Sequence, residues 1–175
     1  RMRIQPGMSV GENPPAGAAF QYWLKEKPKG DATLEIVDAA GKVIRKYSTK
    51  PEAEEPGAAG RRRGGGAAKL AAEKGLNTFS WDLRHEDAKS FPGLIMWAGS
   101  VTGPEVAPGK FTARLTAGDV KLEAPFQVVK DPRLTTVTQE DLNKQEALLL
   151  QIRDKLTETH EAILKIRDIR KQAND

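Results

Sequence analysis

The densest group of chemically capable side chains is the segment Asp82–Asp87, which contains one arginine, one histidine and three carboxylates. A histidine beside carboxylates can act as a general base or bind a metal ion. However, Asp82 and Arg84 alternate with apolar residues, so strand geometry directs them away from a core. Catalysis also needs a cleft and partner groups that this pattern does not supply. We therefore interpret the cluster around His85 as structural and predict no catalytic residue.

Other motifs of catalysis and cofactor binding are missing from the sequence. It contains no cysteine and only two histidines, His85 and His160, which excludes thiol nucleophiles and cysteine- or histidine-rich zinc sites. The run Gly64–Gly66 lacks the Lys-Ser/Thr pair of a phosphate-binding loop. His160 lies among charged residues of a predicted helix, and we expect it to face solvent. We predict no cofactor, no metal site and no enzyme activity for this chain.

Three tryptophans suggest a second class of function, because aromatic faces give sugar rings a large contact area at little entropic cost. Trp81 shares a strand face with Phe79 and is expected in the core. Trp23 lies on the opposite face of its strand from Phe20, and Trp97 lies in a segment flanked by Gly and Pro. Trp23 and Trp97 are therefore the candidate contacts for a polysaccharide or a neighbouring domain. A carbohydrate-binding module is the alternative function.

The net charge of +4 comes largely from one run, Arg61, Arg62 and Arg63. Nucleic-acid binders spread basic residues over a surface instead, so we expect no nucleic-acid partner. The run lies in residues 49–74, where 14 of 26 residues are Gly, Ala or Pro. This composition predicts a flexible insertion. The arginines are either a contact for an anionic partner or, as we favour, a solvated part of that loop.

The length of 175 residues and the hydrophobic content of 38% suit one domain with a packed core, with or without an appendage. No apolar run reaches the roughly 18 residues of a membrane span. The sequence begins with Arg1 rather than Met. We therefore expect a fragment or processed product of a longer protein.

Residues 18–130 follow the period of β-strands. Apolar and polar residues alternate in several short segments, and Gly41 and Gly118-Asp119 provide hairpin turns between them. The apolar segment Leu94–Val101 is a further candidate strand. Six or seven short strands bury one face each most economically as an antiparallel β-sandwich.

After a linker at residues 131–137, the period changes to that of a helix. Thr138 and Asp141 form a capping signal, and residues 138–172 contain neither Gly nor Pro. One long amphipathic helix is therefore predicted, with a hairpin bent near Thr157–His160 as the alternative. Its apolar positions recur every seven residues and define a narrow face: Leu142, Leu149, Ile152, Leu156, Ile163 and Ile166.

This predicted helix is too long for the sandwich alone. About 35 residues span roughly 50 Å, whereas sandwich strands span about 20 Å. Part of the narrow apolar face must therefore overhang, as the seam of a coiled coil would, and exposed apolar faces mark interfaces. We expect the partner to be another domain of the parent protein, a second helix or another subunit.

Several motifs in order carry a resemblance to a known family. Gly11-Glu12-Asn13-Pro14-Pro15 precedes the first strand, Gly75-Leu76-Asn77-x-Phe79-x-Trp81-Asp82-Leu83-Arg84 forms a later one, and Lys130-Asp131-Pro132-Arg133 precedes the helix. Together they resemble the C-terminal region of large bacterial sortilin-type, BNR-repeat β-propeller proteins, often called glycosyl hydrolase-like. The stretch from the hairpin Asp38-x-x-Gly41-Lys42-Val43-Ile44-Arg45 to Trp81-Asp82 is also similar to the Ig-like domain of the flagellar hook-cap protein.

Residues 1–17 hold two Pro-rich turns and are expected to form an entry linker. The resemblance implies an Ig-like or fibronectin-type sandwich at residues 18–130. It also implies a periplasmic or extracellular location and a propeller domain as the partner of the helix. The resemblance implies no catalytic residue in this chain, because the Asp-box of the propeller, Ser-x-Asp-x-Gly-x-x-Trp, does not occur in it. We therefore expect a non-catalytic structural and interaction module, and any hydrolase site would lie on the propeller of the parent.

Overall fold

The computed structural model describes residues 17–50 and 69–174. These residues form six strands and one helix, namely β1 (Ala18–Leu24), β2 (Ala32–Asp38), β3 (Val43–Ser48), β4 (Gly75–Trp81), β5 (Gly109–Ala117), β6 (Val120–Val128) and α1 (Gln139–Asn174). The predicted entry linker, except for residue 17, and the run Arg61–Arg63 lie outside the described residues. The last part of the predicted insertion is described, and there Leu70 is buried while residues 69–74 form no helical turn.

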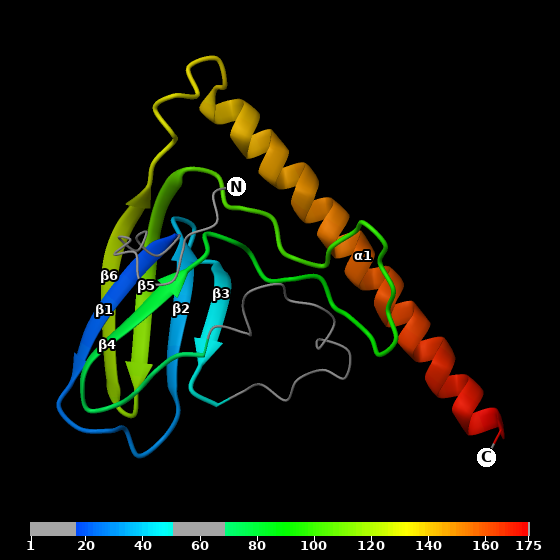
Figure 1. The fold of residues 1–175 in the computed structure, drawn as a ribbon, viewed down its shortest axis with the longest axis horizontal. Helices are drawn as coiled ribbons and strands as arrows, with labels where there is room; N and C mark the ends of the chain where they lie inside the picture. The colour runs from blue at the N-terminus through cyan, green and yellow to red at the C-terminus, as the bar shows by residue number, and fades with distance from the viewer. Residues whose placement is uncertain (1–16, 51–68, 175) are drawn as a thin grey trace, which may run out of the picture.

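The strands form two antiparallel sheets. One sheet pairs β1 with β4, and the other has the order β3-β2-β5-β6 (Figure 1). Tight turns set the pairing of neighbouring strands. Gly118 has a φ of +60° between β5 and β6, and the Asp38 carboxylate accepts hydrogen bonds from two backbone N–H groups between β2 and β3. The fold is therefore the mainly β architecture followed by a long helix that the sequence predicts.

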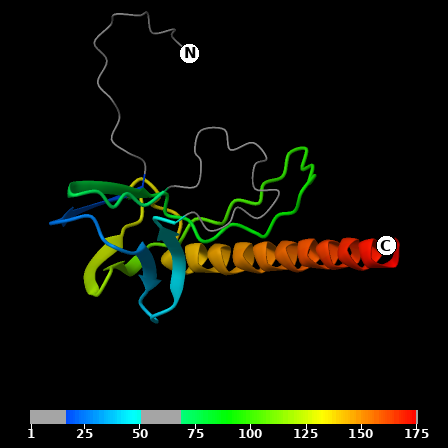
Figure 2. The same cartoon turned by 90° about the horizontal axis from the view of Figure 1, so that it is seen from below.

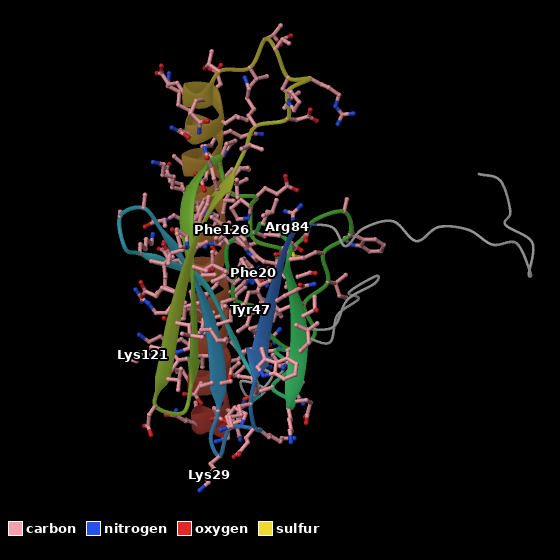
Figure 3. The ribbon with its side chains drawn as sticks, turned by 90° about the vertical axis from the view of Figure 1, so that its left-hand side faces the viewer. Phe20, Lys29, Tyr47, Arg84, Lys121 and Phe126 are labelled. Carbon is pink, nitrogen blue, oxygen red and sulfur yellow. The ribbon has the colours of Figure 1, made fainter. Side chains whose placement is uncertain are left out.

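Aromatic side chains fill the space between the two sheets. Phe20 of β1 lies edge-on to Phe126 of β6, with ring centroids 5.1 Å apart, and Tyr47 of β3 lies 4.5 Å from Phe79 of β4. Trp81 is fully buried, as predicted, and contacts the rings of both Phe111 and Phe126. Figure 3 shows the labelled Phe20, Tyr47 and Phe126 between the sheets. These contacts join residues far apart in the sequence, so they hold the sandwich closed.

A long segment, residues 82–108, connects β4 to β5, and we call it the arm. The chain enters it through Leu83, whose φ of 60° is uncommon for a residue other than glycine. The predicted strand at Leu94–Val101 is wrong, because this part of the arm forms no strand. Instead the arm folds back on itself, with hydrogen bonds from the Ala88 N–H to Val101 and from the His85 N–H to Pro104.

The helix α1 is continuous over 36 residues, so the alternative of a hairpin is wrong. It begins with the predicted capping box, in which the Asp141 N–H donates to the Thr138 hydroxyl and the Thr138 N–H donates to the Asp141 carboxylate. At about 54 Å it is longer than any strand, and Figure 2 shows its C-terminal part extending well beyond the sheets. Figure 1 shows the arm, in green, running beside it. No helix among the described residues is long and apolar enough to cross a membrane.

Candidate interaction surface

One side of α1 is held against the arm by polar side chains. Glu146, Arg153, His160 and Arg167 recur every seven residues, so they lie along one face of the helix. Together with Thr157, they form what we call the polar face. Each of these five side chains makes a contact with the arm, and none of the contacts was predicted from the sequence.

Three contacts of the polar face are made to backbone groups in the first part of the arm. The Lys89 N–H donates to the Thr157 hydroxyl at 3.1 Å, and the Lys89 carbonyl lies against the Nδ1 atom of His160. The Arg153 guanidinium donates to the Glu86 carbonyl at 3.3 Å. Since this part of the arm pairs with no sheet, side chains of the helix satisfy backbone groups that strand pairing would otherwise satisfy.

The ends of the polar face are anchored by a histidine and an aromatic ring. Near the start of α1, the His85 Nε2 lies 2.7 Å from a Glu146 carboxylate oxygen. Farther along, the Arg167 guanidinium lies over the ring of Phe91 and donates to the Pro92 carbonyl at 2.8 Å. The same buried Phe91 ring meets His160 edge-on at 5.0 Å. The contacts therefore extend from the second turn of α1 to within two turns of its end.

The expectation that His160 faces solvent is wrong, because its side chain is only 4% exposed. Its ring is enclosed between the Phe91 ring and the backbone of the arm. Its charged neighbours Glu158 and Glu161 are exposed, but His160 itself lies on the docked face.

The arm is braced in turn by the residues of the predicted polar cluster. The Asp87 carboxylate accepts hydrogen bonds from the Gly103 N–H at 2.9 Å and from Arg45 of β3 at 3.4 Å. Arg45 also donates to the His85 carbonyl at 2.5 Å, and its guanidinium lies over the ring of Tyr47. Burial in this region raises the pKa of the Tyr47 hydroxyl.

The side chains of this cluster make contacts within the fold. His85 contacts Glu146, Asp87 contacts Arg45 and Gly103, and Asp82 accepts a hydrogen bond from the Arg84 N–H. His85 and Asp87 therefore each join two parts of the fold, whereas the contact of Asp82 is local. Among the residues that the structure describes, no group of three His, Asp or Glu side chains could hold a metal ion.

Beside the polar face lies the apolar face that the sequence predicts, which we call the apolar stripe. Ile152 precedes Arg153 and Ile166 precedes Arg167, and adjacent residues of a helix lie about 100° apart around its axis. Ile152 and Ile166 therefore point to one side of the docked face, and they are 55% and 64% exposed. Leu149 is also exposed, whereas the other predicted residues are half-buried: Leu142, Leu156 and Ile163.

A groove separates the N-terminal half of the apolar stripe from the arm. It has a volume of about 430 Å³, and its helical wall includes Leu142, Leu149, Ile152 and Leu156. The opposite wall is the returning part of the arm, residues 100–108. The stripe thus combines exposed apolar side chains with a concave flank, on a helix whose orientation is fixed by the polar face. Its exposed neighbour Leu148 was not among the predicted residues.

The two tryptophans proposed as sugar contacts are both exposed. Trp23 is 70% exposed and stands opposite Leu76 on the outer side of the β1–β4 sheet. Trp97 is 98% exposed and lies in the arm. They belong to separate parts of the fold, so the structure does not bring them together into one platform.

Comparisons of the chain with family models, curated proteins and solved structures give no match.

Proposed function

We propose that this chain is a non-catalytic structural and interaction module that docks a partner on the apolar stripe of α1. The observation that carries this proposal is the division of the helix into two sides. The polar face fastens α1 to the arm, while Ile152 and Ile166 remain more than half exposed on the adjacent side. A helix fastened in this way presents its apolar residues at a fixed angle, which lowers the entropic cost of binding.

The resemblance of the sequence supports a context for this module. In it, the two sheets are an Ig-like or fibronectin-type sandwich in the C-terminal part of a large exported bacterial β-propeller protein. The partner is then the propeller domain of that parent or another subunit, in the periplasm or outside the cell. Any hydrolase activity of the parent belongs to its propeller.

The proposal is tested by affinity capture from extracts of the producing organism with two variant baits. Ile152→Asp combined with Ile166→Asp places charge on the stripe, and Ala147→Asp combined with Gln151→Asp places it on another exposed side of the same helix. We expect the first bait to lose a partner that the second retains, and cross-linking to map that partner to the stripe. Equal capture by both baits would contradict the proposal.

The exposure of the tryptophans favours a second candidate function, the binding of polysaccharide. An almost fully exposed indole offers its face to a sugar ring without rearrangement. In this case Trp97 or Trp23 acts alone, and titration with a panel of polysaccharides should change tryptophan fluorescence. The change should disappear in one of the two variants, Trp97→Ala or Trp23→Ala. A titration of the native chain without a change in fluorescence would contradict polysaccharide binding.

A further inference from the structure

The two ends of α1 carry opposite charge. Its first eleven residues, 139–149, contain three acidic side chains and one basic one, whereas its last eleven, 164–174, contain four basic side chains and one acidic one. Exposed members include Glu140 and Asp141 at the first end and Lys165, Arg170 and Lys171 at the last. A second helix of the same sequence complements this pattern only when it runs in the opposite direction.

The spacing of the residues in the apolar stripe indicates which kind of partner can pack against it. Leu142, Leu149, Leu156 and Ile163 form one seven-residue series, and Gln145, Ile152, Thr159 and Ile166 form a second. Such a paired series packs against another helix with the same repeat, because the knobs of one helix then meet the holes of the other along its whole length. The chain itself carries a helix with this repeat.

We propose that the apolar stripe of α1 pairs antiparallel with the stripe of a second copy of this chain, an inference that rests on the proposed role of the stripe. Leu149 then lies against Ile166 of the second copy, and Ile152 lies against its Ile163. The same register sets Gln145 beside Arg170 of the second copy, so a polar residue of the seam meets a polar partner. It also brings the acidic end of each helix to the basic end of the other.

The groove beside the stripe fits this arrangement. It flanks the N-terminal half of α1, where Leu149 and Ile152 line it together with residues 100–108 of the arm. In the antiparallel register, this half receives the C-terminal half of the second helix, including its exposed Ile166. Both copies have the same groove, so a single two-fold axis places the helix of each copy beside the groove of the other.

The first test is the mass of the native chain in solution, measured by light scattering at about 100 µM, a concentration that populates dimers of micromolar affinity. We expect twice the 19.1 kDa of one chain. Ile152→Asp combined with Ile166→Asp should restore the single mass, and the control pair Ala147→Asp and Gln151→Asp should leave the doubled mass unchanged. The dimer should also dissociate more readily as the salt concentration rises, because exposed charge pairs are screened.

The second test is disulfide cross-linking. The chain has no cysteine of its own, so only the introduced cysteines can form a disulfide. Leu149→Cys and Ile166→Cys are made as separate variants and oxidised singly and as a mixture. The antiparallel register predicts abundant cross-linked dimer only in the mixture. Efficient cross-linking of each variant alone would indicate a parallel pair and overturn the proposal.

A single mass for the native chain at this concentration would also overturn the second copy as the occupant. It would leave the proposed function standing if the capture experiment still maps another partner to the stripe. If the native chain has the single mass and the capture experiment maps no partner to the stripe, then the stripe is not an interaction surface.

Discussion

The sandwich and the junction between α1 and the arm are held together by different kinds of contact. In the sandwich, aromatic rings such as the buried Trp81 and the half-buried Phe126 contact one another across the two sheets. At the junction, side chains such as Arg153 and Arg167 donate to backbone carbonyls of the arm. Burial of apolar area is worth about 25 cal/mol per Å², whereas one hydrogen bond contributes about 1 kcal/mol net. The sandwich should therefore set the global stability of the chain, and the junction should set the orientation of α1.

The largest effect that separates the two regions should come from Trp81→Ala. Removing a fully buried indole in contact with Phe111 and Phe126 should lower the free energy of unfolding by about 3–5 kcal/mol. Urea denaturation followed by circular dichroism measures the change. Trp97→Ala is the matched control, since its side chain is 98% exposed, and it should change stability little. Similar losses in both variants would contradict the assignment of the core.

A smaller and more local effect is expected from Gly103→Ala in the arm. A Cβ atom at this position overlaps the carbonyl oxygens of His85 and Glu86. The outgoing and returning segments of the arm must therefore move apart. We expect faster hydrogen exchange in the arm and in the facing part of α1, with unchanged exchange in β2 and β5. Gly30→Ala is the control, because a Cβ atom there meets nothing within 4 Å. Exchange that rises equally in the sheets would mean that the arm and the sandwich unfold as one unit.

The smallest effect concerns the start of α1 and its dependence on pH. Hydrogen bonds from Thr138 lower the pKa of the Asp141 carboxyl below its ordinary value. A carboxyl with a lowered pKa stabilises the folded state above the pKa of the unfolded chain, about 3.9, and this contribution disappears as the pH falls through the folded pKa. The native chain should therefore be more stable than Asp141→Asn at neutral pH, and the two should converge as the pH falls below the folded pKa of this carboxyl. A constant difference across this range would contradict a role for the ionised carboxylate.

The sequence predicts the sandwich well because burial of one sheet face leaves a period of two. Phe79 and Trp81 illustrate this, since they alternate with less buried residues and are buried as expected. The same reasoning fails for Leu94–Val101, where apolar character without alternation suggested a strand. That segment belongs to the arm, whose path is set by long-range backbone contacts such as Ala88 to Val101.

The apolar stripe was also predictable, because its seven-residue period is regular. The polar face beside it is not evident from the sequence, and the prediction that His160 faces solvent is wrong for this reason. The recurrence of Glu146, Arg153, His160 and Arg167 every seven residues is a signal that could have found it. However, polar side chains at helical spacing face solvent in most proteins. Only the position of the arm distinguishes a docked polar face from a solvated one.

The central claim is that α1 is fastened by its polar face and leaves the apolar stripe available to a partner. The most direct measurement is the free energy of unfolding of the variant that combines Ile152→Asp with Ile166→Asp, at a concentration low enough to keep the chain monomeric. We predict a value within about 1 kcal/mol of the control that combines Ala147→Asp with Gln151→Asp, because exposed positions tolerate charge. A loss of about 3 kcal/mol or more, together with loss of the β-sheet signal, would show that the stripe belongs to the core of this chain and would contradict the account.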